Sequence, residues 1–281
     1  MSRILVVEDD DTVRLVISRA LAKGGYSVSE ARDGGEALEA LRHDRFDLMV
    51  LDIWMPKVTG LDLLRELRRV ERAPRVVVIT SDDAPETLLE AVRGQAFSYV
   101  HKPIEPAKLL ATVREALEAP EPPPIEVLSA RAHWVELQVP CSREAVNRIE
   151  AVMAQLDTDL PPELREQIGF ALRELAMNAV EWGGKLDPTR SVRISCLRAK
   201  RMILYRIADP GAGFNIEELP HAAIGQPPTD PIAHMEVREA KGMRPGGFGL
   251  LSVQSSVDEL LYNEKRNEVV FVKYLDDGGK R

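Results

Sequence analysis

The first 119 residues of the chain alternate strictly between short apolar runs and amphipathic segments. The apolar runs have the length and composition of buried strands and lie at residues 4–7, 26–30, 47–51, 76–80 and 98–100. The segments between them carry apolar residues at helical spacing and lie at residues 11–23, 34–43, 61–70, 85–93 and 105–118. Because strand and helix alternate in this way, we expect a doubly wound parallel sheet, which is an α/β fold.

A proline-rich segment interrupts this pattern at residues 120–124, whose sequence is Pro-Glu-Pro-Pro-Pro. Proline fixes φ and lacks a backbone N–H, so the segment ends the preceding helix and predicts a stiff, extended linker. A chain of 281 residues is long enough for two domains that each bury a core. We therefore expect one domain over residues 1–119, a linker over residues 120–126 and a second domain over residues 127–281.

After the linker, strands and helices follow a different order. We expect strands at residues 133–139, 191–197, 202–208, 258–263 and 269–274. Helices are expected at residues 142–156, 162–182 and 248–256, and a stretch rich in glycine and proline occupies residues 209–247. Neighbouring strands mixed with helices in this manner predict an α+β sandwich.

Charge and composition exclude several classes of protein. The net charge of −8 disfavours a general nucleic-acid binder, and no helix-turn-helix pattern follows the linker. No apolar run approaches the roughly 20 residues that span a bilayer, and the start, Met-Ser-Arg, does not resemble a secretory signal. Cys141 and Cys196 lack the spacing of a metal or redox site. We therefore expect a cytoplasmic protein that contacts neither nucleic acid nor a membrane directly.

Polar residues cluster where the strands of the first domain are expected to end. Glu8 and Asp9 follow the first strand, Asp52 follows the third, Thr80 ends the fourth and Lys102 follows the fifth. The carboxyl ends of parallel strands meet at one edge of a sheet, so these side chains should converge. Carboxylates suit Mg²⁺, whereas an ammonium group and a hydroxyl would bind a phosphoryl group. The layout therefore predicts a Mg²⁺-assisted phosphoacceptor at Asp52.

The same residues belong to a set of short motifs: Val7-Glu8-Asp9, Asp52 with Met55-Pro56 and Gly60, Thr80-Ser81, and Tyr99 before Lys102-Pro103. With these motifs, residues 1–119 resemble a response-regulator receiver domain, which has a flavodoxin-like fold. The resemblance implies that Asp52 accepts a phosphoryl group from an upstream sensor histidine kinase, with Lys102 and Thr80 at the acceptor site. The alternative is a flavodoxin-like domain whose acidic residues are only solvated, and the several positions in register disfavour it.

The receiver resemblance also assigns roles to neighbouring groups. Mg²⁺ would be bound by the carboxylates of Glu8, Asp9 and Asp52 and by the backbone carbonyl of Trp54. Thr80 and Tyr99 would form a conformational relay, and the Lys102–Pro103 peptide bond would be cis.

A second group of polar residues and glycines lies in the second domain. Glu174 and Asn178 are four residues apart on an expected helix, so they share one of its faces. The Asn178 carbonyl suits Mg²⁺, and Glu174 could polarise an attacking hydroxyl. Two glycine-containing segments follow, Asp209-Pro210-Gly211-Ala212-Gly213 and Gly246-Gly247-Phe248-Gly249. The carboxylate of Asp209 can accept a hydrogen bond from an adenine amine, and the glycines beside it let the backbone approach a ligand. The segment 246–249 begins a helix whose N-terminus can bind phosphates.

In this order, residues 127–281 resemble the Bergerat-fold ATP-binding domain of the gyrase, chaperone and kinase superfamily. The resemblance implies ATP and Mg²⁺ as ligands, with residues 216–245 as a lid and Asn178 also on the metal. The residues that would bind the nucleotide are Asn178, Asp209, Gly211, Gly213, Gly247 and Gly249. The alternative is a polar helix face with two glycine turns and no ligand.

Within that superfamily the layout resembles the anti-sigma-factor serine/threonine kinases more than sensor histidine kinases. A histidine kinase needs a phosphoacceptor on a helical pair, whereas His133 follows the linker in an expected strand. The resemblance implies that Glu174 is the general base toward an anti-anti-sigma-type substrate. It also implies a sigma factor as a further partner and a homodimer. Trp182-Gly183-Gly184 departs from the His-Ala-Tyr-like ending expected after Asn178, and the lid is long and rich in proline.

The sequence therefore indicates a two-component response regulator whose output domain binds ATP–Mg²⁺ and phosphorylates Ser or Thr of a partner, under the control of Asp52. Two alternatives stay open: a non-catalytic ATP-binding anti-sigma or partner-sequestering module, and a hybrid histidine kinase. The direction of the control, activation or inhibition, is not encoded in any motif.

Overall fold

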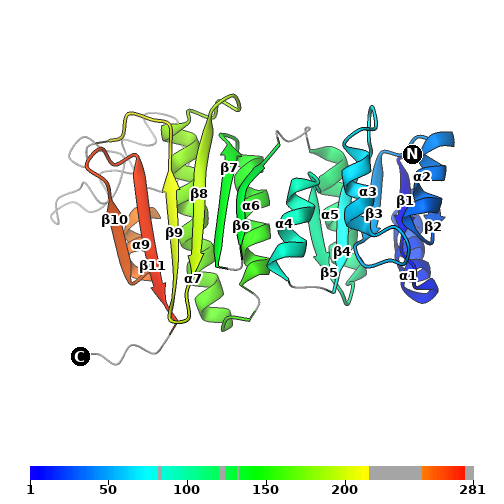
Figure 1. Ribbon diagram of the computed structural model, residues 1–281, viewed down its shortest axis with the longest axis horizontal. Coiled ribbons are helices and arrows are strands. Elements are labelled where there is room, and N and C mark those ends of the chain that lie inside the picture. Colours follow the sequence, from blue (N-terminus) through cyan, green and yellow to red (C-terminus); the bar gives the residue numbers. More distant parts are fainter. Residues whose placement is uncertain (82–83, 120–123, 132, 158, 215–248, 276–281) are drawn as a thin grey trace. The chain divides into compact units, whose positions relative to one another are not determined.

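The structure is a computed structural model that describes residues 1–81, 84–119, 124–131, 133–157, 159–214 and 249–275 (Figure 1). The chain divides into two compact units, Met1–Pro122 and Pro123–Arg281, and each unit has its own sheet. Within the described ranges, no helix has the length and apolar character needed to cross a membrane.

The first unit is built on a five-stranded parallel sheet in the order β2-β1-β3-β4-β5. Its strands are β1 (Arg3–Val7), β2 (Ser27–Ala31), β3 (Leu48–Asp52), β4 (Arg75–Thr80) and β5 (Ser98–His101). Its helices are α1 (Asp11–Lys23), α2 (Gly34–His43), α3 (Gly60–Leu67), α4 (Pro85–Arg93) and α5 (Pro106–Glu118). This strand order is the flavodoxin-like one, and it confirms the predicted α/β fold.

The central strands of this sheet are buried on both faces. Successive side chains of a strand point to opposite faces, so neighbouring apolar residues enter different cores. On one face, Val7 of β1 and Leu51 of β3 belong to a core that includes Leu63 of α3. On the other face, Val6 and Val50 belong to a core shared with α1 and α5. β1 and β3 pair in parallel, from Ile4 with Leu48 to Val7 with Leu51, which brings their carboxyl ends to the same edge of the sheet.

The second unit contains a six-stranded antiparallel sheet in the order β10-β11-β9-β8-β7-β6, with helices packed on one face (Figure 1). The strands are β6 (Glu126–Arg131), β7 (Trp134–Pro140), β8 (Ser191–Arg198), β9 (Met202–Ala208), β10 (Glu259–Tyr262) and β11 (Glu268–Tyr274). The helical elements are α6 (Arg143–Leu156), α7 (Pro162–Asn178), the π-helix η1 (Ala179–Gly183) and α9 (Gly249–Ser256). This architecture confirms the predicted α+β sandwich.

The second unit differs from the sequence-based expectation in three places. Strand β6 was not predicted, because its side chains alternate weakly and its pairing with β7 contains a register shift. The expected helix over residues 162–182 is α-helical only to Asn178, and a π-helix completes it with a hydrogen bond from Gly184 N to Ala179 O of 2.8 Å. His133 lies in the turn before β7 rather than in a strand.

A buried carboxyl group, that of Asp157, lies between α6 and α7. Nη1 of Arg198 lies 3.4 Å from Asp157 Oδ1 and donates to the carbonyl of Leu156 at 2.7 Å. The hydroxyl of Tyr205, a fully buried residue of β9, lies 3.5 Å from Asp157 Oδ2. Burial raises the pKa of Asp157 to about 6, although the Arg198 cation acts in the opposite direction.

The raised pKa of Asp157 predicts a pH-dependent stability for the second unit. In an unfolded chain Asp has a pKa of about 3.9, so folding disfavours the ionised form of this residue. The contribution of Asp157 to the free energy of unfolding should fall as the pH rises from about 4 to about 6, by up to about 3 kcal/mol, and stay low above that window. Asp157→Asn should lose this dependence and exceed the parent in stability at neutral pH, as measured by urea unfolding.

Asp159→Asn is the matched control for that measurement. Asp159 accepts a hydrogen bond of 2.6 Å from the same Arg198, but its side chain is 70% exposed. Its replacement should change the free energy of unfolding by less than about 1 kcal/mol and keep the pH dependence of the parent. The same pH dependence in Asp157→Asn as in the parent would contradict the assignment to Asp157.

Candidate functional site

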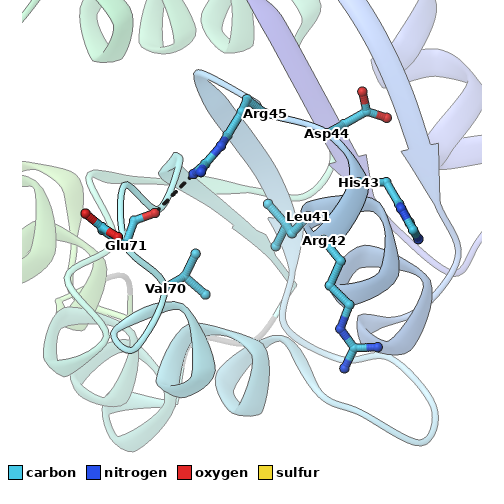
Figure 2. Close-up of a pocket in the computed structure, with 7 residues that line it drawn as sticks. All are labelled: Leu41, Arg42, His43, Asp44, Arg45, Val70 and Glu71. Atoms are coloured by element: carbon cyan, nitrogen blue, oxygen red, sulfur yellow. Dashed lines mark hydrogen bonds between the residues drawn. The ribbon is translucent and has the colours of Figure 1, made fainter.

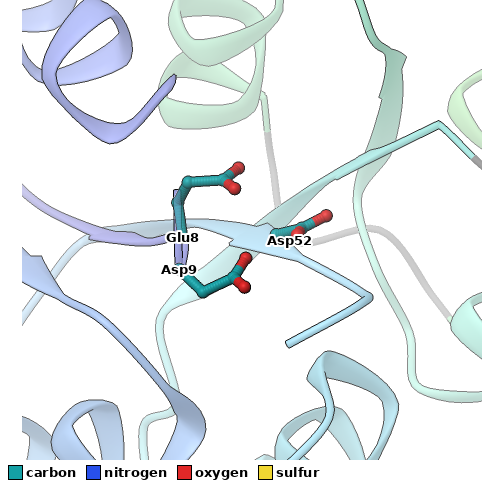
Figure 3. Close-up of side chains that lie close together, drawn as sticks. All are labelled: Glu8, Asp9 and Asp52. Carbon is teal, nitrogen blue, oxygen red and sulfur yellow. The ribbon is translucent and has the colours of Figure 1, made fainter. Parts of the chain in front are cut away.

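Three carboxylates converge at the carboxyl edge of the parallel sheet (Figure 3). Glu8 directly follows β1, Asp9 is next to it, and Asp52 is the last residue of β3. One oxygen of each lies within 4.8 Å of the others. Glu8 and Asp52 are buried, whereas Asp9 is exposed. Oxygen atoms at this spacing fit a divalent cation such as Mg²⁺, which prefers carboxylate ligands.

Lys102 supplies positive charge at the same point. Its Nζ lies 2.9 Å from Glu8 Oε2 and 3.2 Å from Asp52 Oδ1. Burial raises the pKa of Glu8 and of Asp52, and the ammonium group of Lys102 opposes that rise. One ammonium offsets only part of the charge of three carboxylates, so a bound cation would complete the neutralisation. The Lys102–Pro103 peptide bond is cis, as expected.

Thr80 ends the neighbouring strand at the same edge. It is buried, and its carbonyl accepts a hydrogen bond of 2.8 Å from the backbone N of Lys102. Tyr99 lies in the adjacent strand β5, and Trp54 lies two residues after Asp52 with a largely exposed side chain. The structure thus brings Thr80 to the edge that carries Asp52. The relay through Thr80 and Tyr99 and the metal contact of the Trp54 carbonyl stay predictions from the resemblance.

A buried arginine, which no sequence motif singled out, supports the carboxylate site. Arg14 of α1 is only 5% exposed. Its Nη1 donates to the carbonyl of Glu8 at 2.7 Å, and its guanidinium also pairs with Asp11 and, at 3.4 Å, with Glu30. Arg14 therefore holds the turn that carries Glu8 and Asp9. The available signal was a charged residue on the apolar face of a predicted helix.

A hollow of about 280 Å³ lies elsewhere in the first unit, between the end of α2 and the segment before β4 (Figure 2). Its lining residues are Leu41, Arg42, His43, Asp44, Arg45, Val70 and Glu71. Arg45 Nη1 donates to the carbonyl of Glu71 at 3.2 Å. These residues precede β3 and β4, whereas Asp52 and Thr80 end those strands. The hollow therefore lies at the opposite edge of the sheet and takes no part in the carboxylate site.

In the second unit, α7 meets the beginning of α9 at Glu174. A Cβ atom on Gly249, the first residue of α9, would overlap Oε2 of Glu174. Asn178, one turn further along α7, is its last residue, and both polar residues are partly buried. Free backbone N–H groups at a helix N-terminus attract anions. The predicted base therefore lies beside the predicted phosphate-binding helix.

Asp209 directly follows β9 and packs against the end of η1. A Cβ atom on Gly183 would overlap Oδ1 of Asp209, which also accepts a hydrogen bond of 2.7 Å from Gly211 N. Burial raises the pKa of the Asp209 carboxyl. From the sequence, Trp182-Gly183-Gly184 was only a departure from an expected motif. The structure gives Gly183 a physical role, because the absence of its side chain makes room for Asp209.

The turn between β10 and β11 holds the segment that follows Asp209. Gly213 has a φ of 83°, and a Cβ atom there would overlap the carbonyl of Lys265. Asn267 Nδ2 donates to the carbonyl of Gly211 at 3.3 Å. Gly211 and Gly213 are therefore fixed in place by a neighbouring hairpin. Two predicted parts of the site lie outside the described residues: Gly247 and the lid over residues 216–245.

Comparison with protein families divides the chain in the same order. Residues 4–114 match the response regulator receiver domain, and residues 139–273 match the histidine kinase-like ATPase domain. The response regulator MprA of Mycobacterium leprae (strain TN) is 39% identical over 120 residues, which are 43% of this chain and 53% of that protein. MprA of Mycobacterium tuberculosis (strain ATCC 25618 / H37Rv) is also 39% identical over 120 residues, which are 43% of this chain and 52% of that protein. The chain thus spans about half the length of the curated relatives it matches.

Solved structures of receiver domains match a similar share of the chain. The CheY-like receiver domain protein of Methanospirillum hungatei JF-1 is 28% identical with a TM-score of 0.41, over 42% of this chain and 94% of that one. The chemotaxis protein CheY4 of Vibrio cholerae is 31% identical with a TM-score of 0.39, over 42% and 99% of the two chains.

Asp9 allows a direct test of the carboxylate site. Asp9→Asn removes one of three clustered negative charges and should weaken Mg²⁺ binding by about tenfold or more, as measured by calorimetric titration. Asp10→Asn is the matched control, because Asp10 Oδ1 accepts a hydrogen bond of 2.8 Å from Thr12 N and caps α1. Asn caps a helix as well as Asp does, so this variant should bind Mg²⁺ like the parent. Equal Mg²⁺ affinity in both variants would show that Asp9 is not a ligand of the metal ion.

Gly183 allows a corresponding test in the second unit. Gly183→Ala adds a methyl group where the Asp209 carboxylate lies, so ATP affinity should fall by about tenfold or more in competition with a fluorescent ATP analogue. Gly169→Ala in α7 is the control, because a Cβ atom there meets nothing within 4 Å. That variant should keep the ATP affinity of the parent and gain about 0.5–1 kcal/mol of stability. Unchanged ATP affinity in Gly183→Ala would show that ATP binding does not depend on the observed position of the Asp209 carboxylate.

Proposed function

Residues 4–114 of this chain are a response regulator receiver domain and residues 139–273 are a histidine kinase-like ATPase domain, and on that premise we propose a phosphorylation-controlled serine/threonine kinase. An upstream sensor histidine kinase would phosphorylate Asp52. The second domain would bind ATP–Mg²⁺ and phosphorylate Ser or Thr of a partner of the anti-anti-sigma type. The observation that carries the proposal is the position of Glu174 against Gly249 at the start of α9.

The first domain has the groups that a phosphoacceptor needs. Glu8 and Asp9 would hold Mg²⁺ next to the Asp52 carboxylate. That carboxylate would attack the phosphorus of the donor phosphohistidine while the bond from that phosphorus to the histidine nitrogen breaks and the donor histidine leaves. Lys102, whose Nζ lies 3.2 Å from Asp52 Oδ1, would neutralise the charge of the new phosphoryl group. Thr80, at the end of the next strand, would donate a hydrogen bond to it.

The second domain has groups that suit each part of ATP–Mg²⁺. The Asp209 carboxylate would accept a hydrogen bond from the adenine amine, and the glycine at position 211 lets the backbone approach the ligand. The N-terminus of α9 would bind phosphate oxygens, and the Asn178 carbonyl would bind Mg²⁺. Bound ATP–Mg²⁺ supplies the phosphoryl group that is transferred.

Glu174 would act as the general base of the transfer. It would take the proton from the substrate hydroxyl while the hydroxyl oxygen forms its bond to the γ-phosphorus and the bond to the ADP oxygen breaks. Glu174 lies beside the start of α9, so phosphates bound at that helix N-terminus would be close to it, and the substrate hydroxyl would have to arrive there. The homodimer and the sigma factor as a further partner rest on the resemblance and form part of the same proposal.

A second candidate function is a non-catalytic ATP-binding module that sequesters a sigma factor or another partner. The same contact favours it, because a carboxylate packed on a helix N-terminus also acts as a cap for that helix. A hybrid histidine kinase is less compatible with the structure. His133 lies in a turn, and its carbonyl accepts a hydrogen bond of 3.0 Å from Arg198 N.

Glu174→Gln separates the kinase from the binding module. The substitution keeps the shape and polarity of the side chain but cannot accept a proton at neutral pH. Transfer of radiolabelled phosphate to an anti-anti-sigma-type protein should fall by a factor of about 10² to 10⁴, whereas ATP affinity should change by less than about threefold. The assay is run on the full chain with and without a small-molecule phosphodonor, and Asp52→Asn should abolish any response to the donor.

Glu166→Gln is the matched control, because Glu166 is an exposed residue of the same helix. It should transfer phosphate at the rate of the parent. Undiminished transfer by Glu174→Gln would overturn the base assignment. A parent chain that binds ATP but modifies no partner would support the binding module instead, and acid-labile, base-stable phosphate on the chain itself would support the histidine kinase.

A further inference from the structure

The guanidinium of Arg190 is bound to the loop that carries Asp209. Arg190 lies in the turn before β8, and its Nη2 donates to the carbonyl of Pro210 at 2.6 Å. The backbone of Arg190 is itself fixed, because its N donates to Asp187 O at 3.0 Å and its O accepts from Cys141 N at 2.9 Å. The arginine therefore extends from a rigid base to the residue immediately after Asp209.

The opposite side of the same loop is bound by Asn267. Its carbonyl accepts a hydrogen bond of 2.9 Å from Asp209 N, and its Nδ2 donates to Gly211 O at 3.3 Å. The Asp209 loop is thus held between a cation on one side and a neutral amide on the other. Of these two contacts, the one with Arg190 brings a charge to the loop.

The charged and titratable neighbours of Asp209 define its state. Burial raises the pKa of Asp209, whereas the backbone N–H of Gly211 and the cation of Arg190 lower it. The buried thiol of Cys141 is also close enough to be affected by Asp209, and its pKa is raised mainly by burial. Asp187 acts on that same thiol. Within the part of the chain that the structure describes, Arg190 is the cation that opposes the burial of Asp209.

The charge on Asp209 decides which base it can recognise. An ionised carboxylate only accepts hydrogen bonds, so at the position of the adenine amine it pairs with that amine and repels the O6 carbonyl that guanine places there. A protonated carboxyl group can donate to that carbonyl, so it no longer rejects guanine. A buried polar group that meets the wrong partner discriminates more strongly than an apolar contact does.

We propose that Arg190 is a positioning residue that makes this site select adenine over guanine nucleotides, by fixing the Asp209 loop through the Pro210 carbonyl and bringing a cation to that loop. This inference rests on the proposed ATP-binding function. It concerns base selection, whereas the phosphate and Mg²⁺ contacts lie on α7 and α9.

Arg190→Gln tests the proposal in the full chain, with the affinities for ATP and for GTP measured by calorimetric titration between about pH 5 and pH 8. The glutamine can still donate to a carbonyl but has no charge, so Asp209 should become protonated at a higher pH than in the parent. ATP affinity should therefore fall by about tenfold or more at the acidic end and recover toward the alkaline end. The preference for ATP over GTP should shrink by a similar factor over the same window.

Two further variants distinguish charge from structure. Arg190→Lys keeps the cation, so it should keep the pH profile and base preference of the parent even if the affinity for both nucleotides falls equally. Arg193→Gln, a charge-matched change at an exposed residue of β8, should behave like the parent. These two variants also keep the test open if Arg190→Gln fails to fold, which thermal unfolding would reveal.

The outcomes separate this inference from the proposed function. An equal, pH-independent loss of affinity for ATP and GTP in Arg190→Gln would show that Arg190 has only a structural role and would overturn the proposal. An unchanged ATP preference in that variant would overturn it as well, while leaving ATP binding intact. A parent chain that binds neither nucleotide would overturn the proposed function and this inference together.

Discussion

The carboxylates of Glu8 and Asp52 are buried at the ends of adjacent parallel strands, so their negative charges repel each other. The rest of the site in the first domain has to offset that repulsion. Register and two-sided burial fix β1 beside β3, so the two groups cannot separate. Like charges this close in a poorly solvated place are costly unless a cation is present. Lys102 meets part of that requirement from a third strand end. The remaining negative charge fits the proposed binding of a metal ion and the proposed phosphorylation of Asp52.

The second domain positions its carboxylates by a different means, which is the absence of side chains. Gly183 leaves the space that Asp209 fills, and Gly249 leaves the space that Glu174 fills. In both places a carboxylate reaches a backbone at the end of a helical element. A methyl group on Gly183 would overlap the Asp209 carboxylate and its Cβ, whereas one on Gly249 would overlap only the flexible end of Glu174. Packing therefore constrains Gly183 more strongly than Gly249.

Sequence periodicity was enough to predict the two sheets, because burial on one or two faces leaves a direct trace in the order of apolar residues. The convergence of strand ends followed from the parallel topology. Periodicity could not reveal β6, whose weak alternation becomes a strand only through pairing with β7. It marked Arg14 only as a charged residue on the apolar face of a helix and gave no sign of Arg190. The partners of both are backbone carbonyls, and a carbonyl is present at every residue whatever its type.

The position of β6 sets a limit on how the chain can be divided. It begins at Glu126, is an edge strand of the described sheet and pairs with β7. A fragment that started after β6 would leave unpaired those backbone N–H and C=O groups of β7 that face β6, and such an edge is a template for strands from other molecules. A separately produced ATP-binding domain therefore has to start before Glu126. In a nucleotide-binding assay on a shorter fragment, self-association through the exposed edge of β7 would compete with the binding being measured.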